Sequence, residues 1–414
     1  MSHPHDATLP ATLPAAAASA AAFAALIMRR RFTPSQTKIY AAAQLQPMLR
    51  RLPTLTRGHR APPLVPTGML QSATVDAYNP PAEHTPWVRE NIQLASLKLD
   101  GRAKPSCCPP TIPDGLVSLD WLHVEDSIDA LDAAEATPSP STTPICIVIP
   151  SLTGDSRSPY LRRAAVALRA DGMRVACYNP RGRGGNPLLS PFMYGAGYTG
   201  DLRRVVAHIR ARYPRAPIIG VGYSLGGVYL AKLLAEDGPD SQLAGAVSLA
   251  SPIHIDRLAQ HLRSTWLGHL IDRFVIAPSV RDTLAAYVEA PGATGDLEAA
   301  RSSRTLEHID EGVLAPMMGC ESKEQYYAES TPSLRDVRVP LLMLQAENDP
   351  IKPYGLQQAL EAATCDSGAP LVLAVTPEGG HSLTWPEGWR AEASWGERVV
   401  VEWARERASH SISD

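Results

Sequence analysis

A glycine-flanked serine at a strand-to-helix junction restricts the fold of this 414-residue chain more than any other feature. The residues Gly222 to Gly226 follow the pattern G-x-S-x-G, with a strand-like apolar run before them and a helix-like apolar run after them. This order is that of a nucleophile elbow, a tight turn that presents a serine hydroxyl at the edge of a sheet. Glycine at both flanks leaves room for close packing of the strand and the helix. A serine that only caps the helix is the alternative interpretation.

Strand-like and helix-like segments alternate on both sides of this turn. The short apolar runs are rich in β-branched residues, which is typical of strands buried on both faces. The alternation predicts an α/β fold with a mostly parallel central sheet and helices on both faces. The predicted strands are 91–99, 116–121, 145–149, 174–178, 217–222, 243–249, 341–345 and 371–376, and the predicted helices are 160–171, 200–213, 225–236, 355–363 and 392–408.

The alternation stops between residues 251 and 339, where the sequence is mostly helix-like and irregular. An insertion within a regular series of strands and helices predicts a helical cap over the carboxyl edge of the sheet, where ligands bind in open α/β sheets. We predict a catalytic domain at 91–410, and the 44% of apolar residues in the chain is sufficient for a large core.

An acid and a base follow the serine in the chain, and a serine hydroxyl needs such a base to attack at neutral pH. Asp349 follows the first strand after the cap, and His381 follows the next strand, behind two glycines that let its loop bend back. This chain order predicts Ser224 as nucleophile, His381 as base and Asp349 as the acid that orients the base. Glu347 is the alternative acid.

Reaction at an acyl carbon also requires donors for the negative charge that develops on oxygen. The first predicted donor is the backbone N–H of Leu225, and the second is that of Leu152, in the loop after the strand at 145–149. No metal and no organic cofactor is predicted, because acyl transfer by a triad needs neither. Four histidines in or beside the cap are interpreted as structural or surface residues: His254, His261, His269 and His308.

Charge and cysteine content narrow the choice of partners and compartment. The net charge of −3 gives no indication of nucleic acid as a partner. The six cysteines lack zinc-ligand spacing, so we predict free thiols in a reducing compartment. The sequence makes no prediction of oligomeric state.

Residues 1–90 have a composition of their own and are predicted to form an Ala-, Arg- and Pro-rich N-terminal extension. The first 75 residues hold one acid, Asp6, against eight Lys and Arg residues. An Ala-rich run from Ala15 to Met28 directly precedes three arginines, and it is shorter than the about 20 residues that span a bilayer. A transit peptide, a membrane anchor and a dispensable tail all fit this pattern. We therefore predict an intracellular protein that is membrane-associated or organellar.

Five further motifs accompany the elbow: Ser151 to Ser156 with Tyr160; Asn179 to Asn186 with Tyr194 and Asp201; Gln325 to Tyr327 with Ser330; Asn348 to Pro350; and Gly379 to His381. Together they resemble a family of α/β-hydrolases that includes fungal medium-chain fatty acid ethyl ester synthase/esterases and animal monoacylglycerol lipase-like and phospholipase-like abhydrolases. The resemblance runs from about Trp121 to Trp403. Two positions differ from the common pattern of relatives: Ser151 stands where Gly is common, and Asn348 where Asp is common.

The resemblance implies a serine hydrolase that cleaves carboxylic esters of acyl lipids through an acyl-enzyme, with medium-chain or monoacylglycerol-type esters as expected substrates. An alcohol O-acyltransferase with the same triad, a peptidase, and a non-catalytic scaffold of the same fold are the alternatives. Arg181 and Arg183 are candidates for a phosphate head-group site, although bracing of the loop by backbone hydrogen bonds is the favoured interpretation.

Overall fold

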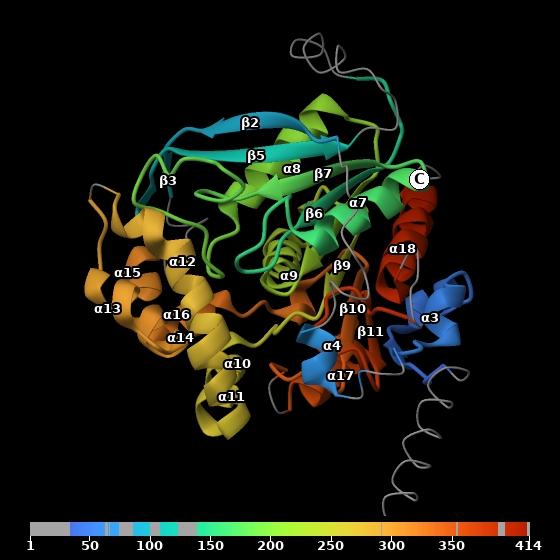
Figure 1. Cartoon of the computed structure of the whole chain (residues 1–414). Helices are drawn as coiled ribbons and strands as arrows, with labels where there is room; N and C mark the ends of the chain where they lie inside the picture. The colour runs from blue at the N-terminus through green and yellow to red at the C-terminus, as the bar shows by residue number, and fades with distance from the viewer. Residues whose placement is uncertain are drawn as a thin grey trace, which may run out of the picture.

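The computed structural model describes residues 34–62, 65, 67–73, 86–99, 108–122, 139–290, 292–352, 355–387 and 394–411. Within these residues, nine strands form one sheet in the order β1-β11-β10-β9-β8-β6-β7-β5-β2 (Figure 1). The strands are β1 (Lys38–Ala41), β2 (Val88–Leu94), β5 (Gly115–Leu122), β6 (Ile145–Ile149), β7 (Arg174–Asn179), β8 (Ile218–Tyr223), β9 (Gly245–Leu249), β10 (Leu341–Ala346) and β11 (Leu371–Thr376). A separate ribbon pairs β3 (Leu97–Lys98) with β4 (Thr111–Ile112).

The centre of the sheet is parallel, as the alternating pattern predicts. Strands β7, β6, β8, β9, β10 and β11 pair in parallel with one another, whereas the pairs β1–β11, β5–β7 and β2–β5 towards the two edges are antiparallel. Because the parallel strands end at one edge, the loops that follow β8, β10 and β11 meet there. Those loops contain the serine, the acid and the histidine identified in the sequence.

Helices cover both faces of the sheet, and this explains the continuous apolar runs of its strands. Alternate side chains of β6 enter different cores: Ile145 and Ile147 pack with helices α8 (Gly200–Arg212), α9 (Leu225–Asp237) and α17 (Leu356–Asp366). Cys146 and Val148 pack with α7 (Pro159–Ala170) and α18 (Trp395–Ser411) on the other face. A strand with a core on each side has no solvent face, so polar alternation is absent.

Part of the predicted N-terminal extension belongs to the sheet. Strand β1 pairs antiparallel with β11, and α3 (Pro53–Arg57) packs against α18 (Figure 1). The predicted boundary at residue 90 is therefore wrong for this stretch, because β1 is short and its neighbours carry none of the regular alternation that marked the later strands. The Ala-rich run and its arginines lie outside the described residues. None of the helices in the described part has the length and apolarity that a membrane crossing needs.

A helical cap connects β9 to β10, as predicted. It has its own apolar core and lies beside the sheet edge that bears the serine loop (Figure 1). Its elements are α10 (Ile255–Ser264), α11 (Trp266–Ile271), η3 (Asp272–Ile276), α12 (Ala277–Val288), α13 (Leu297–Ser302), α14 (Leu306–Ile309), η4 (Asp310–Leu314), α15 (Ala315–Met317) and α16 (Lys323–Ser330). The segments η3 and η4 are π-helical. Cys320 of the cap is disulfide-bonded, so the prediction of free thiols is wrong at this position.

Candidate active site

Ser224 occupies a strained turn between β8 and α9. Its backbone has φ 50° and ψ −115°, a conformation that non-glycine residues rarely adopt. A Cβ at Gly222 would lie 2.4 Å from the Gly226 carbonyl oxygen, and a Cβ at Gly226 would lie 2.4 Å from the Pro150 carbonyl oxygen. Both glycines are therefore required by backbone packing, which explains the motif on each side of the serine.

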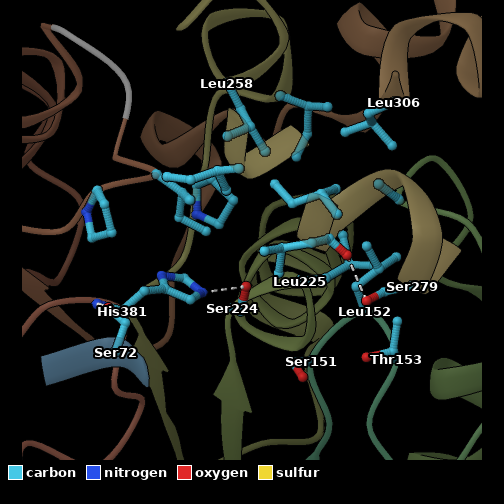
Figure 2. Close-up of a pocket in the computed structure, with 18 of the residues that line it drawn as sticks. Ser72, Ser151, Leu152, Thr153, Ser224, Leu225, Leu258, Ser279, Leu306 and His381 are labelled. Atoms are coloured by element: carbon cyan, nitrogen blue, oxygen red, sulfur yellow. Dashed lines mark hydrogen bonds between the residues drawn. The ribbon is translucent and has the colours of Figure 1, made fainter. Parts of the chain in front are cut away.

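The serine, histidine and acid predicted from the sequence lie in one hydrogen-bonded row, and Figure 2 shows the bond between Ser224 and His381. His381 Nε2 is 3.1 Å from Ser224 Oγ, and His381 Nδ1 is 2.8 Å from Asp349 Oδ2. An ionised carboxylate only accepts hydrogen bonds, so the imidazole proton is on Nδ1. The lone pair of Nε2 is then free to accept the serine proton.

Glu347, the alternative acid, is directed elsewhere. Its Oε1 lies 2.7 Å from Lys38 Nζ on strand β1, and its backbone N–H donates to the Thr376 carbonyl. Asp349 is buried, and besides His381 it accepts from the Ile351 N–H at 2.9 Å. The geometry thus favours Asp349 over Glu347 as the partner of the histidine.

Helix α4 (Gly68–Ala73) supports the histidine loop, a contact that the sequence does not indicate. The Ser72 hydroxyl accepts from the His381 backbone N–H at 2.7 Å, and the Gln71 side-chain oxygen accepts from the Gly379 N–H at 2.8 Å. Figure 2 shows Ser72 next to His381 on the side away from the cap residues. A segment 309 residues away in the chain therefore fixes the position of the base.

Asn348 completes this support and gives a physical reason for the departure from the aspartate common in relatives. Its Nδ2 donates to Gln71 Oε1 at 3.0 Å, and its Oδ1 accepts from the Gly380 N–H at 2.9 Å. An ionised aspartate has no donor, so one of its oxygens would face the Gln71 oxygen and two hydrogen-bond acceptors would lie together. The asparagine therefore suits a chain in which α4 supplies a glutamine at this point.

We expect Ser72→Ala to lower kcat about fivefold with little change in KM, because a neutral hydrogen bond contributes about 1 kcal/mol. The substitution frees the His381 N–H and loosens the base without touching the cavity wall opposite. Ser302→Ala is the matched control, since the Ser302 hydroxyl also bonds the carbonyl four residues earlier in its own helix. Equal kcat values for the two variants would show that Ser72 does not position the histidine.

The two predicted oxyanion donors lie beside the serine. Both Leu152 and Leu225 line the cavity that holds Ser224 and His381. Leu225 is the first residue of α9, where backbone N–H groups have no partner within the helix. The Ser151 carbonyl accepts from the Gly154 N–H at 3.0 Å within the loop turn. Because the C=O and N–H of a trans peptide point in opposite directions, the Leu152 N–H points out of this turn.

Side chains from three other segments hold this loop. The Tyr160 hydroxyl accepts from the Ser151 N–H at 2.9 Å, the Tyr194 hydroxyl donates to the Leu152 carbonyl, and Arg183 donates to the Thr153 carbonyl. Arg183 thus braces the loop through a backbone contact, which confirms the favoured interpretation of that arginine. With its carbonyls engaged on the outer side, the loop keeps a fixed orientation next to the serine.

A buried polar network anchors the far end of the loop. The Ser156 N–H donates to Asn179 Oδ1 at 2.9 Å, and the Ser156 hydroxyl donates to Asp120. Asp120 also accepts from Asn179 Nδ2 at 3.0 Å and pairs with Arg89 at 2.7 Å. Each buried polar group is partnered, which is what a rigid network requires. Sequence reasoning missed Asp120 because it lies inside a strand with no motif around it.

Arg181 is structural rather than part of a head-group site. It is 1% exposed, and its guanidinium makes two hydrogen bonds to Asp201, at 2.6 and 3.0 Å. A further guanidinium nitrogen donates to the carbonyls of Pro113 and Asp114. Four of the five donors of Arg181 are used within the protein in this way, two of them on backbone carbonyls, so the interpretation of Arg181 as a brace is confirmed.

The cavity next to Ser224 is mainly apolar and has a volume of about 410 Å³, within the range of small-ligand sites. Its wall comes from the oxyanion loop, the elbow, the cap and α4, and Figure 2 shows Leu258 and Leu306 across the cavity from the serine. The two elements at its rim, α4 and the α11–η3 segment, carry exposed apolar side chains: Met69, Leu70, Trp266, Leu270, Phe274 and Val275.

The four histidines assigned to structural roles do not line this cavity within the described residues. His261 bonds the Pro350 carbonyl with its Nε2 at 3.1 Å and so ties helix α10 to the loop of the acid. Burial lowers the pKa of His254, which precedes that helix. His381 is thus the histidine that the structure brings to the serine.

The segment that contains most of these site residues matches the sequence profile of a hydrolase family. The sequence profile of the Hydrolase_4 family, described as "Serine aminopeptidase, S33", matches residues 153–385, more than half of the chain. The match begins in the oxyanion loop and extends beyond His381.

Three individual proteins are similar over most of the chain. Embryogenesis-associated protein EMB8 of Picea glauca is 30% identical over 298 residues, which cover 70% of this chain and 63% of that protein. Phospholipase ABHD3 of Homo sapiens is 25% identical, covering 72% and 71% respectively, and monoacylglycerol lipase of Saccharomyces cerevisiae is 28% identical, covering 64% and 58%. The match thus spans less than two thirds of the spruce and yeast proteins.

Proposed function

This chain belongs to the Hydrolase_4 family of α/β-hydrolases, and from that premise we propose that it is a carboxylic ester hydrolase that cleaves acyl lipid esters through an acyl-enzyme on Ser224. The observation that carries the proposal is the hydrogen-bonded row of Ser224, His381 and Asp349 at the base of an apolar cavity. Relatives named phospholipase and monoacylglycerol lipase support esters of lipids as the substrate class.

In the first half of the reaction, Ser224 Oγ attacks the ester carbonyl carbon while His381 Nε2 takes the hydroxyl proton. The carbonyl π electrons move to the oxygen, and the N–H groups of Leu225 and Leu152 donate to the resulting oxyanion. Collapse re-forms the carbonyl and breaks the bond to the alcohol oxygen, which takes the proton from Nε2. Asp349 holds the Nδ1 proton throughout and stabilises the imidazolium.

In the second half, water replaces the alcohol. It loses a proton to His381 Nε2 and attacks the acyl-enzyme carbonyl; collapse then breaks the bond to Ser224 Oγ, which regains the proton. The fatty acid leaves as the second product. The cavity suits the acyl chain rather than a polar peptide, since most side chains around it are apolar. The exposed apolar rim likewise suits a substrate delivered from a lipid aggregate.

Fluorophosphonate labelling followed by p-nitrophenyl esters of increasing acyl length tests this proposal. We expect stoichiometric labelling and a kcat/KM that rises with acyl length, because each buried methylene contributes about 0.8 kcal/mol, until the cavity is filled. The acyl length at which kcat/KM is highest then gives the length of chain that the cavity accommodates. A folded protein that neither reacts with the probe nor hydrolyses any ester of the series would contradict the proposal and favour the scaffold alternative.

A further inference from the structure

The mainly apolar cavity contains one buried acid that the proposed reaction does not use. Asp310 is 2% exposed, and it lines the same cavity as Ser224 and His381. It is the first residue of the π-helical segment η4, and π-helical turns are rare and frequent at functional sites. A carboxyl group among apolar side chains is costly unless its hydrogen-bonding needs are met.

One oxygen of this carboxyl has a fixed partner and the other has none in the described part of the chain. The Tyr327 hydroxyl donates to Asp310 Oδ2 at 2.9 Å. No basic side chain pairs with Asp310 among the described residues, since the nearby Lys323 pairs with Glu307 at 3.0 Å and Glu311 at 3.1 Å. The cap therefore presents a carboxyl with one free oxygen to a cavity of apolar side chains.

The protonation state of this group suits a neutral ligand. Burial raises the pKa of Asp310 to about 8, so the carboxyl is mostly uncharged at pH 7. An uncharged carboxyl donates through its O–H and accepts through its other lone pairs. A substrate hydroxyl has the same two capacities, whereas a hydrocarbon chain has neither and a phosphate would gain no positive partner here.

We propose that Asp310, held by Tyr327, binds a hydroxyl group of the substrate, so that the preferred substrates of this chain are acyl esters that carry a free hydroxyl. This inference rests on the proposed ester hydrolysis and specifies its substrate class. A site built to pair with a hydroxyl discriminates against analogues that lack it, because the buried polar group is then left without a partner. Partial esters of a polyol fit this requirement, whereas esters without a free hydroxyl do not.

The test compares two esters of one fatty acid, monodecanoylglycerol and ethyl decanoate, with the wild type and with Asp310→Leu. Loss of one buried hydrogen bond to the substrate lowers kcat/KM by about tenfold to a hundredfold. We expect that loss for the glycerol ester, with kcat/KM for the ethyl ester within about twofold of wild type. The measured quantity is the ratio of the two kcat/KM values, which a general loosening of the cap would leave unchanged.

Two further variants keep the test decisive if Asp310→Leu fails to fold. Asp310→Asn retains a donor and an acceptor and is expected to keep most of the selectivity, whereas Tyr327→Phe removes the bond that orients the acid and is expected to reduce it. Asp272→Asn is the matched control, a buried cap acid that accepts from the Leu306 N–H at 2.9 Å and does not line the cavity. It is expected to leave the ratio unchanged.

Three outcomes would overturn the inference. Equal losses on both esters would assign Asp310 a purely structural role, and unchanged kcat/KM values for both esters in Asp310→Leu would show that the acid does not contact the substrate. Asp310-dependent cleavage of an aminoacyl p-nitroanilide would assign the acid to an amine. Failure of the proposed function itself is distinguishable, because the wild type would then hydrolyse neither ester and would not react with the fluorophosphonate.

Discussion

Ser224→Ala is expected to abolish ester hydrolysis, with kcat lowered about 10⁶-fold, and to abolish fluorophosphonate labelling. The substitution removes the oxygen that forms the covalent bond to the acyl group in the proposed mechanism, and it leaves His381 Nε2 without the hydroxyl that lies 3.1 Å from it. The elbow itself should persist, because its shape comes from the glycines that flank the serine and from the Ser224 N–H bond to the Leu249 carbonyl at 2.8 Å.

Steady-state kinetics on a p-nitrophenyl ester and gel detection of the labelled protein measure this effect, with Ser302→Ala as a control for the loss of a serine hydroxyl elsewhere. Circular dichroism should show the same folded state for all three proteins. Retention of more than about a hundredth of the wild-type kcat in Ser224→Ala would place the nucleophile elsewhere, because the oxyanion donors and substrate binding alone give far slower turnover.

Features of this site that have a local sequence pattern, in a strand or in a turn, could be predicted from the sequence. The elbow has a local cause, since Gly222 and Gly226 are required by backbone contacts within the turn itself. Asp349 and His381 follow strands whose apolar runs are recognisable, and parallel strands bring their carboxyl ends to one edge. Chain order and local pattern were therefore enough to choose three residues that the structure brings together.

Contacts made across long chain separations could not be predicted in this way. Ser72 and Gln71 belong to a six-residue helix in a Pro-rich segment, and nothing in their neighbourhood marks them as partners of loop residues 309 and 308 positions later. Strand β1 was missed for a similar reason, because four residues at a sheet edge are too few for a periodic pattern. Asn348 could be noted as unusual, but its role depends on Gln71, which only the folded chain reveals.

The second large loss of activity is expected for Asp349→Asn, which replaces the acid that orients His381. An asparagine that turns its amide N–H toward His381 Nδ1 forces the imidazole proton onto Nε2, where it blocks transfer from the serine. An asparagine in the other orientation keeps the tautomer but does not stabilise the imidazolium, since it is neutral. We expect kcat to fall about 10⁴-fold with KM nearly unchanged, because Asp349 does not line the cavity.

Glu347→Gln is the control that separates the two acids that the sequence left open. Its carboxylate pairs with Lys38 at the partly exposed edge of the sheet, so its loss should leave kcat within about twofold of wild type. The two variants change the same charge within two residues of each other, and a non-specific electrostatic effect would therefore lower both. A large loss in Glu347→Gln with activity kept in Asp349→Asn would instead assign the orienting role to Glu347. Because His381 has one Nδ1 and that atom lies 2.8 Å from Asp349, the geometry requires the two variants to differ.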